Sequence, residues 1–396
     1  WNTVLPAEQC SYSMGNPPFI GSKYQTKEQR AEVRDVWGDI KGVGLLDYVS
    51  AWYAKAADYL LPVSHESRAG FVSTNSITQG EQVGVIWPEL FKRGIKINWG
   101  HRTFSWASEA RGKAHVHVVI VGFCHGEPSV GKRIYDYGPK GEPLGVAVVQ
   151  NISPYLTDGA DKAISNRTKP LCDAPEMCFG NQPIDGGNLI VDGDDLSNFL
   201  LEGPEAEEYL REYVGSREFI NGGRRKVLWL KDVSPQTIRT LPNIVKRLEQ
   251  VREFRLKSTR KVTRELAHQP SQFAFVSHKE SDYLLIPSVS SERRPYIPMG
   301  FMPASIIASN LTLIIPDATP YHFGVLHSAM HMAWVKQVCG RLESRYRYSA
   351  NLVYNNFPWP DPEQVTAKQR QAVESAAQGV LDARANHPDA TLADLY

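Results

Sequence analysis

Two consecutive prolines, Pro17 and Pro18, constrain the fold most strongly near the start of the chain. They follow the apolar-leaning run at residues 10–15, which reads as a buried strand, and Asn16 and Phe19 flank them. Proline has no backbone N–H and holds φ at about −65°, so the pair ends a sheet ladder and fixes the direction of nearby carbonyls. Because open α/β sheets bind ligands at the carboxyl ends of their strands, the sequence predicts a binding site at this corner.

The corner suits an amino group attached to an aromatic ring, such as N6 of adenine. Such a nitrogen is a poor nucleophile because its lone pair is delocalised into the ring. The Asn16 side-chain oxygen and the Pro17 carbonyl can accept its two N–H hydrogens and direct the lone pair at an electrophile. Phe19 can stack on the ring. The same four residues also suit an ordinary turn.

Composition sets broad limits on the chain. With 396 residues, 42% of them hydrophobic, it is long enough for two or three domains with cores of their own. No run approaches about 20 apolar residues and no signal-peptide pattern is present, so we expect no membrane span and a cytoplasmic location. The net charge of +1 leaves nucleic-acid binding open, since binding faces are local.

Cysteine and histidine spacings do not match a metal site. The five cysteines are scattered, and Cys172 and Cys178 stand farther apart than zinc ligands usually do, so free thiols are expected. His322, His327 and His331 are irregularly spaced without acidic partners, which favours packing or capping roles. We therefore predict no metal.

Alternating strand and helix patterns fill the first third of the chain, as in half of a doubly wound sheet. Apolar residues at helical spacing predict helices, and alternating apolar residues predict strands. The expected helices are 26–37, 45–61 and 80–91, and the expected strands are 68–74, 95–99 and 114–123.

The pattern is mixed after Phe123. Residues 126–145 are rich in Gly, Pro and charge, which indicates a linker or an irregular start to a second domain. Short strands are expected at 226–230, 272–276 and 284–287, a helix at 321–340, a proline-bounded connector at 355–360 and terminal helices over 362–396. Basic residues predominate over 245–264 and at 224–226.

Several motifs carry a family resemblance over most of the chain. The chain resembles the amino-methylating, S-adenosylmethionine-dependent DNA adenine methyltransferases, and most closely the fused restriction-modification enzymes of the MmeI type. The most specific motif is Met14-Gly15-Asn16-Pro17-Pro18-Phe19-Ile20-Gly21. The other matching segments are 46–53, 70–81, 101–106, 111–114, 215–219 and 354–360.

The resemblance implies an α/β fold class in three parts. Residues 1–125 would form the C-terminal half of a class I, Rossmann-like methyltransferase sheet. Residues 126–330 would form a mixed α+β target recognition domain, and residues 331–396 a helical segment. The implied function is sequence-specific N6-adenine methylation of double-stranded DNA with base flipping, in a restriction-modification system that uses S-adenosylmethionine.

Residue roles follow from the same resemblance. It implies that Asn16, Pro17, Pro18 and Phe19 hold the flipped adenine and that Phe104 packs on the base from the other side. Trp106 is the competing choice for that aromatic, and Phe104 also suits a core position. Asp47 and Asn75 match positions near cofactor or strand-end loops in similar enzymes, and both equally suit caps.

Long polar loops in the second part suit base edges and phosphates. The segment 288–296 is one such loop between apolar segments. Each arginine named here also suits a solvated surface position. The candidate DNA contacts are Arg217, Arg224, Arg225, Arg260, Arg293 and Arg294.

The family pattern is incomplete in one respect. Similar enzymes need a Gly-rich loop between a strand and a helix to bind the cofactor, and no such motif occurs in this sequence. Gly122 and Gly126 end a late strand, and Gly186, Gly187 and Gly193 follow no strand–helix pattern. We expect a piece of a longer protein whose missing part holds the cofactor loop and could hold a nuclease.

Such a piece would be inactive alone, and two copies could pair across its exposed sheet edge. Two other functions stay open. One is a DNA specificity module without catalysis. The other is a methylase of glutamine side chains or of guanine amines in RNA.

Overall fold

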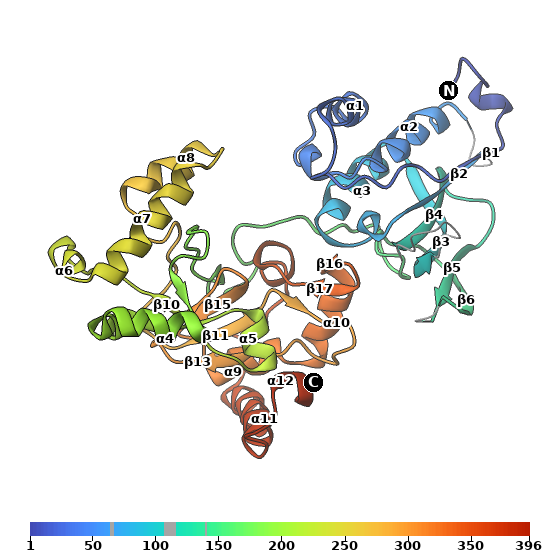
Figure 1. The fold of residues 1–396 in the computed structure, drawn as a ribbon. Helices are drawn as coiled ribbons and strands as arrows, with labels where there is room; N and C mark the ends of the chain where they lie inside the picture. The colour runs from blue at the N-terminus through green and yellow to red at the C-terminus, as the bar shows by residue number, and fades with distance from the viewer. Residues whose placement is uncertain (64–66, 107–115, 139–140) are drawn as a thin grey trace. The chain divides into compact units, whose positions relative to one another are not determined.

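The computed structural model describes residues 1–63, 67–106, 116–138 and 141–396 (Figure 1). The chain forms two compact units, which are described separately. The first unit comprises Trp1–Thr168, Trp334–Arg347 and Asn351–Asn356, and the second comprises the remaining residues from Lys169 onward. The expected ranges 1–125, 126–330 and 331–396 differ from these bounds.

A six-stranded mixed sheet forms the centre of the first unit, in the order β1-β2-β4-β3-β5-β6. Strand β1 runs parallel to β2, while β4 is antiparallel to both β2 and β3. The carboxyl ends of β1, β2 and β3 therefore meet at one edge. The strands are β1 (Tyr12–Gly15), β2 (Arg68–Thr74), β3 (Ile95–Trp106), β4 (Val116–His125), β5 (Lys132–Tyr137) and β6 (Pro143–Val149).

Helices α1 (Lys27–Trp37), α2 (Ser50–Leu60) and α3 (Val83–Lys92) supply the apolar side chains that bury one face of this sheet. Tyr53 and Trp87 from the helices pack with Phe71 and Phe123 from the strands. A capping box at Thr26 fixes the start of α1. The predicted helices and strands are confirmed over the described residues, although α2 begins later than expected and β3 continues to Trp106. Residues 114–115 of the strand expected at 114–123, and the matching segment 111–114, lie outside the described residues.

Two expectations about this sheet were wrong. The segment 126–145 is not a linker, because β5 pairs with β3 and β6 pairs with β5 to extend the sheet. The strand before Asn16 is not buried: Tyr12 is 64% exposed and Met14 is 80% exposed. Strand β1 lies at the edge of the sheet, so it has a neighbour on one side only. The expected pairing of two copies across this edge stays a prediction.

Two four-stranded sheets organise the second unit, with orders β14-β9-β10-β8 and β13-β11-β15-β7. The strands are β7 (Cys178–Phe179), β8 (Ile190–Val191), β9 (Leu210–Val214), β10 (Arg225–Leu228), β11 (Tyr283–Pro287), β13 (Gly300–Met302), β14 (Ile306–Ala308) and β15 (Thr312–Pro316). The short strand β12 (Val289–Ser290) also belongs to the second unit, whereas β16 (Gly340–Leu342) and β17 (Arg345–Arg347) belong to the first. The fold is thus mixed α+β, as expected for this part.

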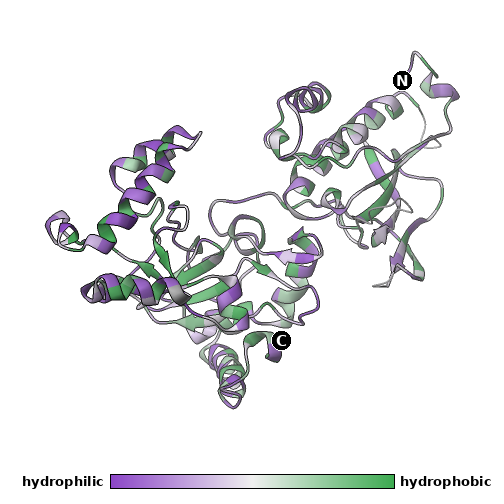
Figure 2. Ribbon diagram, viewed as in Figure 1, coloured by the Kyte–Doolittle hydropathy of each residue, from purple (hydrophilic) through white to green (hydrophobic). Residues whose placement is uncertain are grey.

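Helices surround these sheets, and hydrophilic residues are prominent along α7 and α8 (Figure 2). The helices are α4 (Gly193–Glu202), α5 (Ser216–Asn221), α6 (Pro235–Arg239), α7 (Pro242–Leu256), α8 (Lys261–Glu265), α9 (Pro320–Leu326), α10 (Ala329–Val338), α11 (Ala367–Ala385) and α12 (Leu392–Leu395). The strands expected at 226–230 and 284–287 and the terminal helices are confirmed.

Three details of the second part differ from expectation. Residues 272–276 form no strand, only an isolated bridge at Phe275. The helix expected over 321–340 is two helices, because the Ser328 hydroxyl accepts a hydrogen bond from the His331 N–H and starts α10. Gly193 is the first residue of helix α4, which follows strand β8 after Asp192, but β8 has only two residues and this turn has one glycine.

Candidate functional site

The Asn16 corner lies directly after β1 at the carboxyl edge of the first sheet. Asn16 and Pro18 are exposed, Pro17 is buried and Phe19 is half-buried. The buried Pro17 anchors the corner while the Asn16 amide faces solvent. This exposure leaves the side-chain oxygen of Asn16 available to a ligand.

Asp47 braces the loop that follows the corner. Its Oδ1 accepts a hydrogen bond from the Ser22 N–H at 2.9 Å, and its Oδ2 accepts one from the Ser76 hydroxyl at 2.7 Å. The Asp47 N–H in turn donates to the Gln82 side chain at 2.9 Å. Asp47 is only 9% exposed. It therefore joins the loop after β1 to the loop after β2, a role that the sequence did not reveal.

Phe104 lies at the same edge of the sheet as the Asn16 corner. Thr74, the last residue of β2, and Phe104 of β3 both stand opposite Val118 of the intervening β4. Asn75, which follows Thr74, begins a short 3₁₀ turn, and its carbonyl accepts a hydrogen bond from the Thr78 N–H. Asn75 thus has a turn role in the structure.

Within the described ranges of the chain, the Phe104 ring has two aromatic neighbours. It stacks on Tyr137, with ring centroids 4.6 Å apart, and lies 6.0 Å from Trp106. Phe104 is half-buried, whereas Trp106 is 40% exposed. No ring contact joins Phe19 and Phe104 among the described residues.

Three of the candidate DNA-binding arginines present exposed side chains with no hydrogen-bonded acid in the part of the chain that the structure describes. They are Arg217 in α5, Arg260 before α8 and Arg293 in the 288–296 loop. Arg224 is also exposed but pairs with Glu212 at 3.0 Å. An exposed pair of this kind contributes little to stability and opens readily to a phosphate.

The remaining two candidates are partly engaged in the fold. Arg225 donates to Glu218 at 3.0 Å, and its guanidinium lies over the Tyr213 ring. Arg294 is half-buried, and its guanidinium reaches the Ser290 hydroxyl at 3.4 Å. These contacts hold both side chains in one orientation.

One arginine of the basic segment 245–264 is structural. Arg255 in α7 is fully buried, and burial lowers the pKa of its guanidinium. Its hydrogen bonds go to backbone carbonyls and tie α7 to two neighbouring loops. The acceptors are Pro183, Ile184, Leu266, Gln269 and Gln272.

The histidines have the packing and capping roles expected from the sequence. His322 Nδ1 accepts from the Thr319 N–H, and His327 bonds to the Tyr396 hydroxyl at 2.6 Å. His331 bonds to the Tyr348 hydroxyl, and burial lowers its pKa to about 3. The described residues include no cluster of three or more His, Cys, Asp or Glu that could hold a metal ion. All five cysteines are free thiols.

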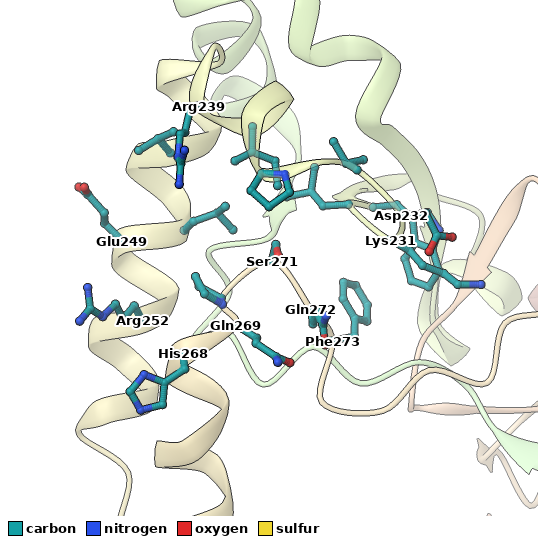
Figure 3. Close-up of a pocket in the computed structure, with 18 of the residues that line it drawn as sticks. Lys231, Asp232, Arg239, Glu249, Arg252, His268, Gln269, Ser271, Gln272 and Phe273 are labelled. Carbon is teal, nitrogen blue, oxygen red and sulfur yellow. The ribbon is translucent and has the colours of Figure 1, made fainter.

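A cavity of about 870 Å³ opens in the second unit beside α6 and α7 (Figure 3). Lys231 and Asp232 lie across the cavity from α7, and Phe273 contributes to its wall. None of the candidate base-binding or DNA-binding residues lines it. Every helix of the described chain is too short or too polar to cross a lipid bilayer.

Comparison with known proteins matches three family profiles along the chain. The MmeI DNA-methyltransferase domain matches residues 1–136, the MmeI target recognition domain matches residues 158–361, and the MmeI C-terminal domain matches residues 365–396. The matched ranges together cover both the Asn16 corner and the candidate DNA-binding arginines.

Two relatives extend over the whole chain. DNA methyltransferase A of Bacillus subtilis (strain 168) is 43% identical over 399 residues, which cover 100% of this chain and 44% of that protein. The solved structure of the type IIL restriction-modification enzyme MmeI in complex with DNA is 48% identical, with a TM-score of 0.94. That match covers 100% of this chain and 52% of the MmeI chain.

The chain thus spans about half the length of the proteins that it matches. The profiles match residues 1–136, 158–361 and 365–396, and both relatives extend over the whole chain. The chain belongs to the MmeI family, and it matches that family's DNA-methyltransferase, target recognition and C-terminal domains.

Proposed function

We propose that this chain forms the target-base side of a sequence-specific DNA N6-adenine methyltransferase that acts on an adenine flipped out of double-stranded DNA. The observation that carries the proposal is the exposed Asn16 amide, held at a carboxyl sheet edge by the buried Pro17. An amino group inside a duplex is out of reach of such a corner, so the base must leave the stack.

The corner acts by accepting hydrogen bonds. The Asn16 side-chain oxygen and the Pro17 carbonyl take the two N–H hydrogens of the adenine amine. The nitrogen then becomes more pyramidal, and its lone pair leaves conjugation with the ring. Phe19 and Phe104 stack on the base and keep its amine within hydrogen-bond distance of these acceptors. The two prolines keep the carbonyls fixed, so little reorganisation accompanies the reaction.

S-adenosylmethionine supplies an electrophilic methyl group when bound. The carbonyl oxygens of the corner fit a neighbouring sulfonium, because they are acceptors and carry partial negative charge. Among the described residues, no Gly-rich turn joins a strand of three or more residues to a helix. We therefore assign no residue of this chain to the cofactor's amino acid.

The second unit supplies sequence recognition in this proposal. Arg217, Arg260 and Arg293 are free to reach phosphates or base edges, and Arg224 can exchange Glu212 for a phosphate. Arg225 and Arg294 are already oriented by protein contacts, which suits a directional contact to a base edge. Double-stranded DNA is the proposed partner, and the cytoplasm is the proposed location.

The product identifies the reaction. The complete protein is incubated with unmethylated genomic DNA and S-adenosylmethionine, and the DNA is digested to nucleosides and analysed by mass spectrometry. The proposal predicts N6-methyladenine at one sequence motif. Methylcytosine as the product, or label in protein or RNA instead of DNA, would contradict it.

A further inference from the structure

A β-bulge in β3 determines which face of the sheet Phe104 occupies. His101 pairs with Ile120, and Phe104 pairs with Val118. The two pairs are therefore separated by three residues along β3 but by only two along β4. In a regular strand, residues three apart point to opposite faces. The additional residue of the bulge reverses this relation, and His101 and Phe104 share one face.

Two tyrosines of β5 lie on the same face as His101 and Phe104. Strand β5 runs parallel to β3 with Tyr135 opposite His101, and Tyr137 follows two residues later. The imidazole of His101 stacks on the Tyr135 ring, with centroids 4.3 Å apart and planes inclined by 6°. Its Nδ1 lies 2.6 Å from the Tyr137 hydroxyl, and the Tyr137 ring stacks on Phe104 at 4.6 Å. The four side chains form a continuous row.

At neutral pH both partners in the hydrogen bond favour their neutral forms. Burial lowers the pKa of the His101 imidazole, and burial together with the nearby Tyr135 raises the pKa of the Tyr137 hydroxyl. A neutral imidazole and a neutral phenol each have a donor and an acceptor, so one of them can donate a hydrogen bond to the other. The bond therefore fixes the Tyr137 ring without introducing a charge beside the Phe104 ring.

We propose that Tyr137 and His101 are positioning residues that hold the Phe104 ring at the carboxyl rim for stacking on the target base. Phe104 lies near the end of β3 and is half-buried, so the sheet alone restricts its ring little. Its stack on Tyr137 supplies that restriction, and the hydrogen bond to His101 fixes Tyr137 in turn. This inference rests on the proposed function, since it assigns Phe104 to the base.

A double-mutant cycle tests the inference in the complete protein. The single-turnover rate of methyl transfer and the affinity for DNA are measured for Phe104→Ala, Tyr137→Ala and the double variant. An aromatic pair of this geometry predicts a loss of rate of about tenfold for Tyr137→Ala, with DNA affinity unchanged within about twofold. If Tyr137 acts through Phe104, the double variant loses no more than Phe104→Ala.

Further variants separate positioning from folding. Tyr137→Phe keeps the stack but loses the bond to His101, so its rate should lie between those of the wild type and Tyr137→Ala. Val148→Ala, at an exposed position of the neighbouring β6, should leave the rate unchanged. Independent losses that multiply in the double variant would overturn the inference. If Asn16→Ala also methylated normally, the proposed function would fail as well, which distinguishes the two.

Discussion

At the scale of single residues, Asp47 determines how the Asn16 corner is held. Its two carboxylate oxygens accept hydrogen bonds from residues 25 and 29 positions away in sequence, Ser22 and Ser76. These residues belong to the loops after β1 and β2. A side chain without acceptors at this position would leave the Ser22 N–H without this partner, and the Ser76 hydroxyl would keep only its hydrogen bond with the Thr74 hydroxyl.

Asp47→Ala is therefore expected to lower the free energy of unfolding by about 1–3 kcal/mol, the usual effect of leaving buried polar groups unpaired. It should also slow methylation, because the loop that follows Phe19 loses its anchor. Chemical denaturation and a methylation assay measure the two effects. Asp58→Ala removes a surface carboxylate that pairs with Arg93 and should cost less than about 1 kcal/mol. Equal effects of the two variants would show that Asp47 is not a brace.

At the scale of elements, α7 and α8 present a basic surface, and the loop 288–296 presents a polar one. Arg255 anchors α7 through buried hydrogen bonds, so exposed residues beyond it are held in place. Arg260, between the two helices, has no acid within hydrogen-bond distance among the described residues. The two surfaces predict different kinds of DNA contact.

Arg260→Ala should weaken DNA binding equally for all sequences. A lost phosphate contact reduces the slope of log K against log salt by about 0.9. Fluorescence anisotropy at several salt concentrations measures this slope. The matched control is Lys92→Ala, because Lys92 precedes the amino end of β3, at the sheet edge opposite Phe104. An unchanged slope for Arg260→Ala would remove this residue from the interface.

Arg293→Ala should instead change which sequence is methylated. An arginine that reads a base edge contributes about 1–3 kcal/mol of discrimination against the wrong base pair. Sequencing of methylated positions in treated genomic DNA shows whether one position of the motif becomes degenerate. A uniform loss of affinity with an unchanged motif would mean that Arg293 contacts phosphate.

The elements differ in how well the sequence predicted them. Strand β2 was predicted at its observed bounds because its β-rich run is bounded by polar turns. The β5–β6 hairpin was missed because its glycine, proline and charged residues interrupt the alternation of apolar and polar residues. In addition, β6 is an edge strand and buries little apolar surface. The Asn16 corner could be predicted because its four residues are adjacent. The Asp47 brace and the Phe104 row could not, because they join residues that only the folded sheet brings together.

At the scale of the whole molecule, acid is expected to destabilise the second unit. Burial lowers the pKa of His331 from 6.5 to about 3, and burial and the nearby Arg384 lower that of His327 to about 4. At mildly acidic pH the unfolded chain therefore binds protons that the folded chain does not. The contribution of these two histidines to the free energy of unfolding is complete above pH 6.5 and is lost as the pH decreases toward 3.

His331→Gln should flatten this dependence. The variant has no imidazole to protonate on unfolding, so its melting temperature should fall less between pH 7 and pH 4.5 than that of the wild type. Its stability at pH 7 is expected to be lower, because Gln fits the buried site less well. His268→Gln, at an exposed position, serves as the control. Parallel pH profiles for His331→Gln and the wild type would contradict the prediction.

The proposed reaction depends most directly on the side-chain amide of Asn16. In the complete protein, Asn16→Ala should reduce the single-turnover rate of methyl transfer by about a hundredfold or more, since removal of one preorganised polar group from a reacting centre has effects of this size. Asn16→Asp keeps an acceptor oxygen and should retain part of the rate. DNA affinity and melting temperature should stay within the error of the wild type. A normal rate for Asn16→Ala, with DNA binding intact, would contradict the account.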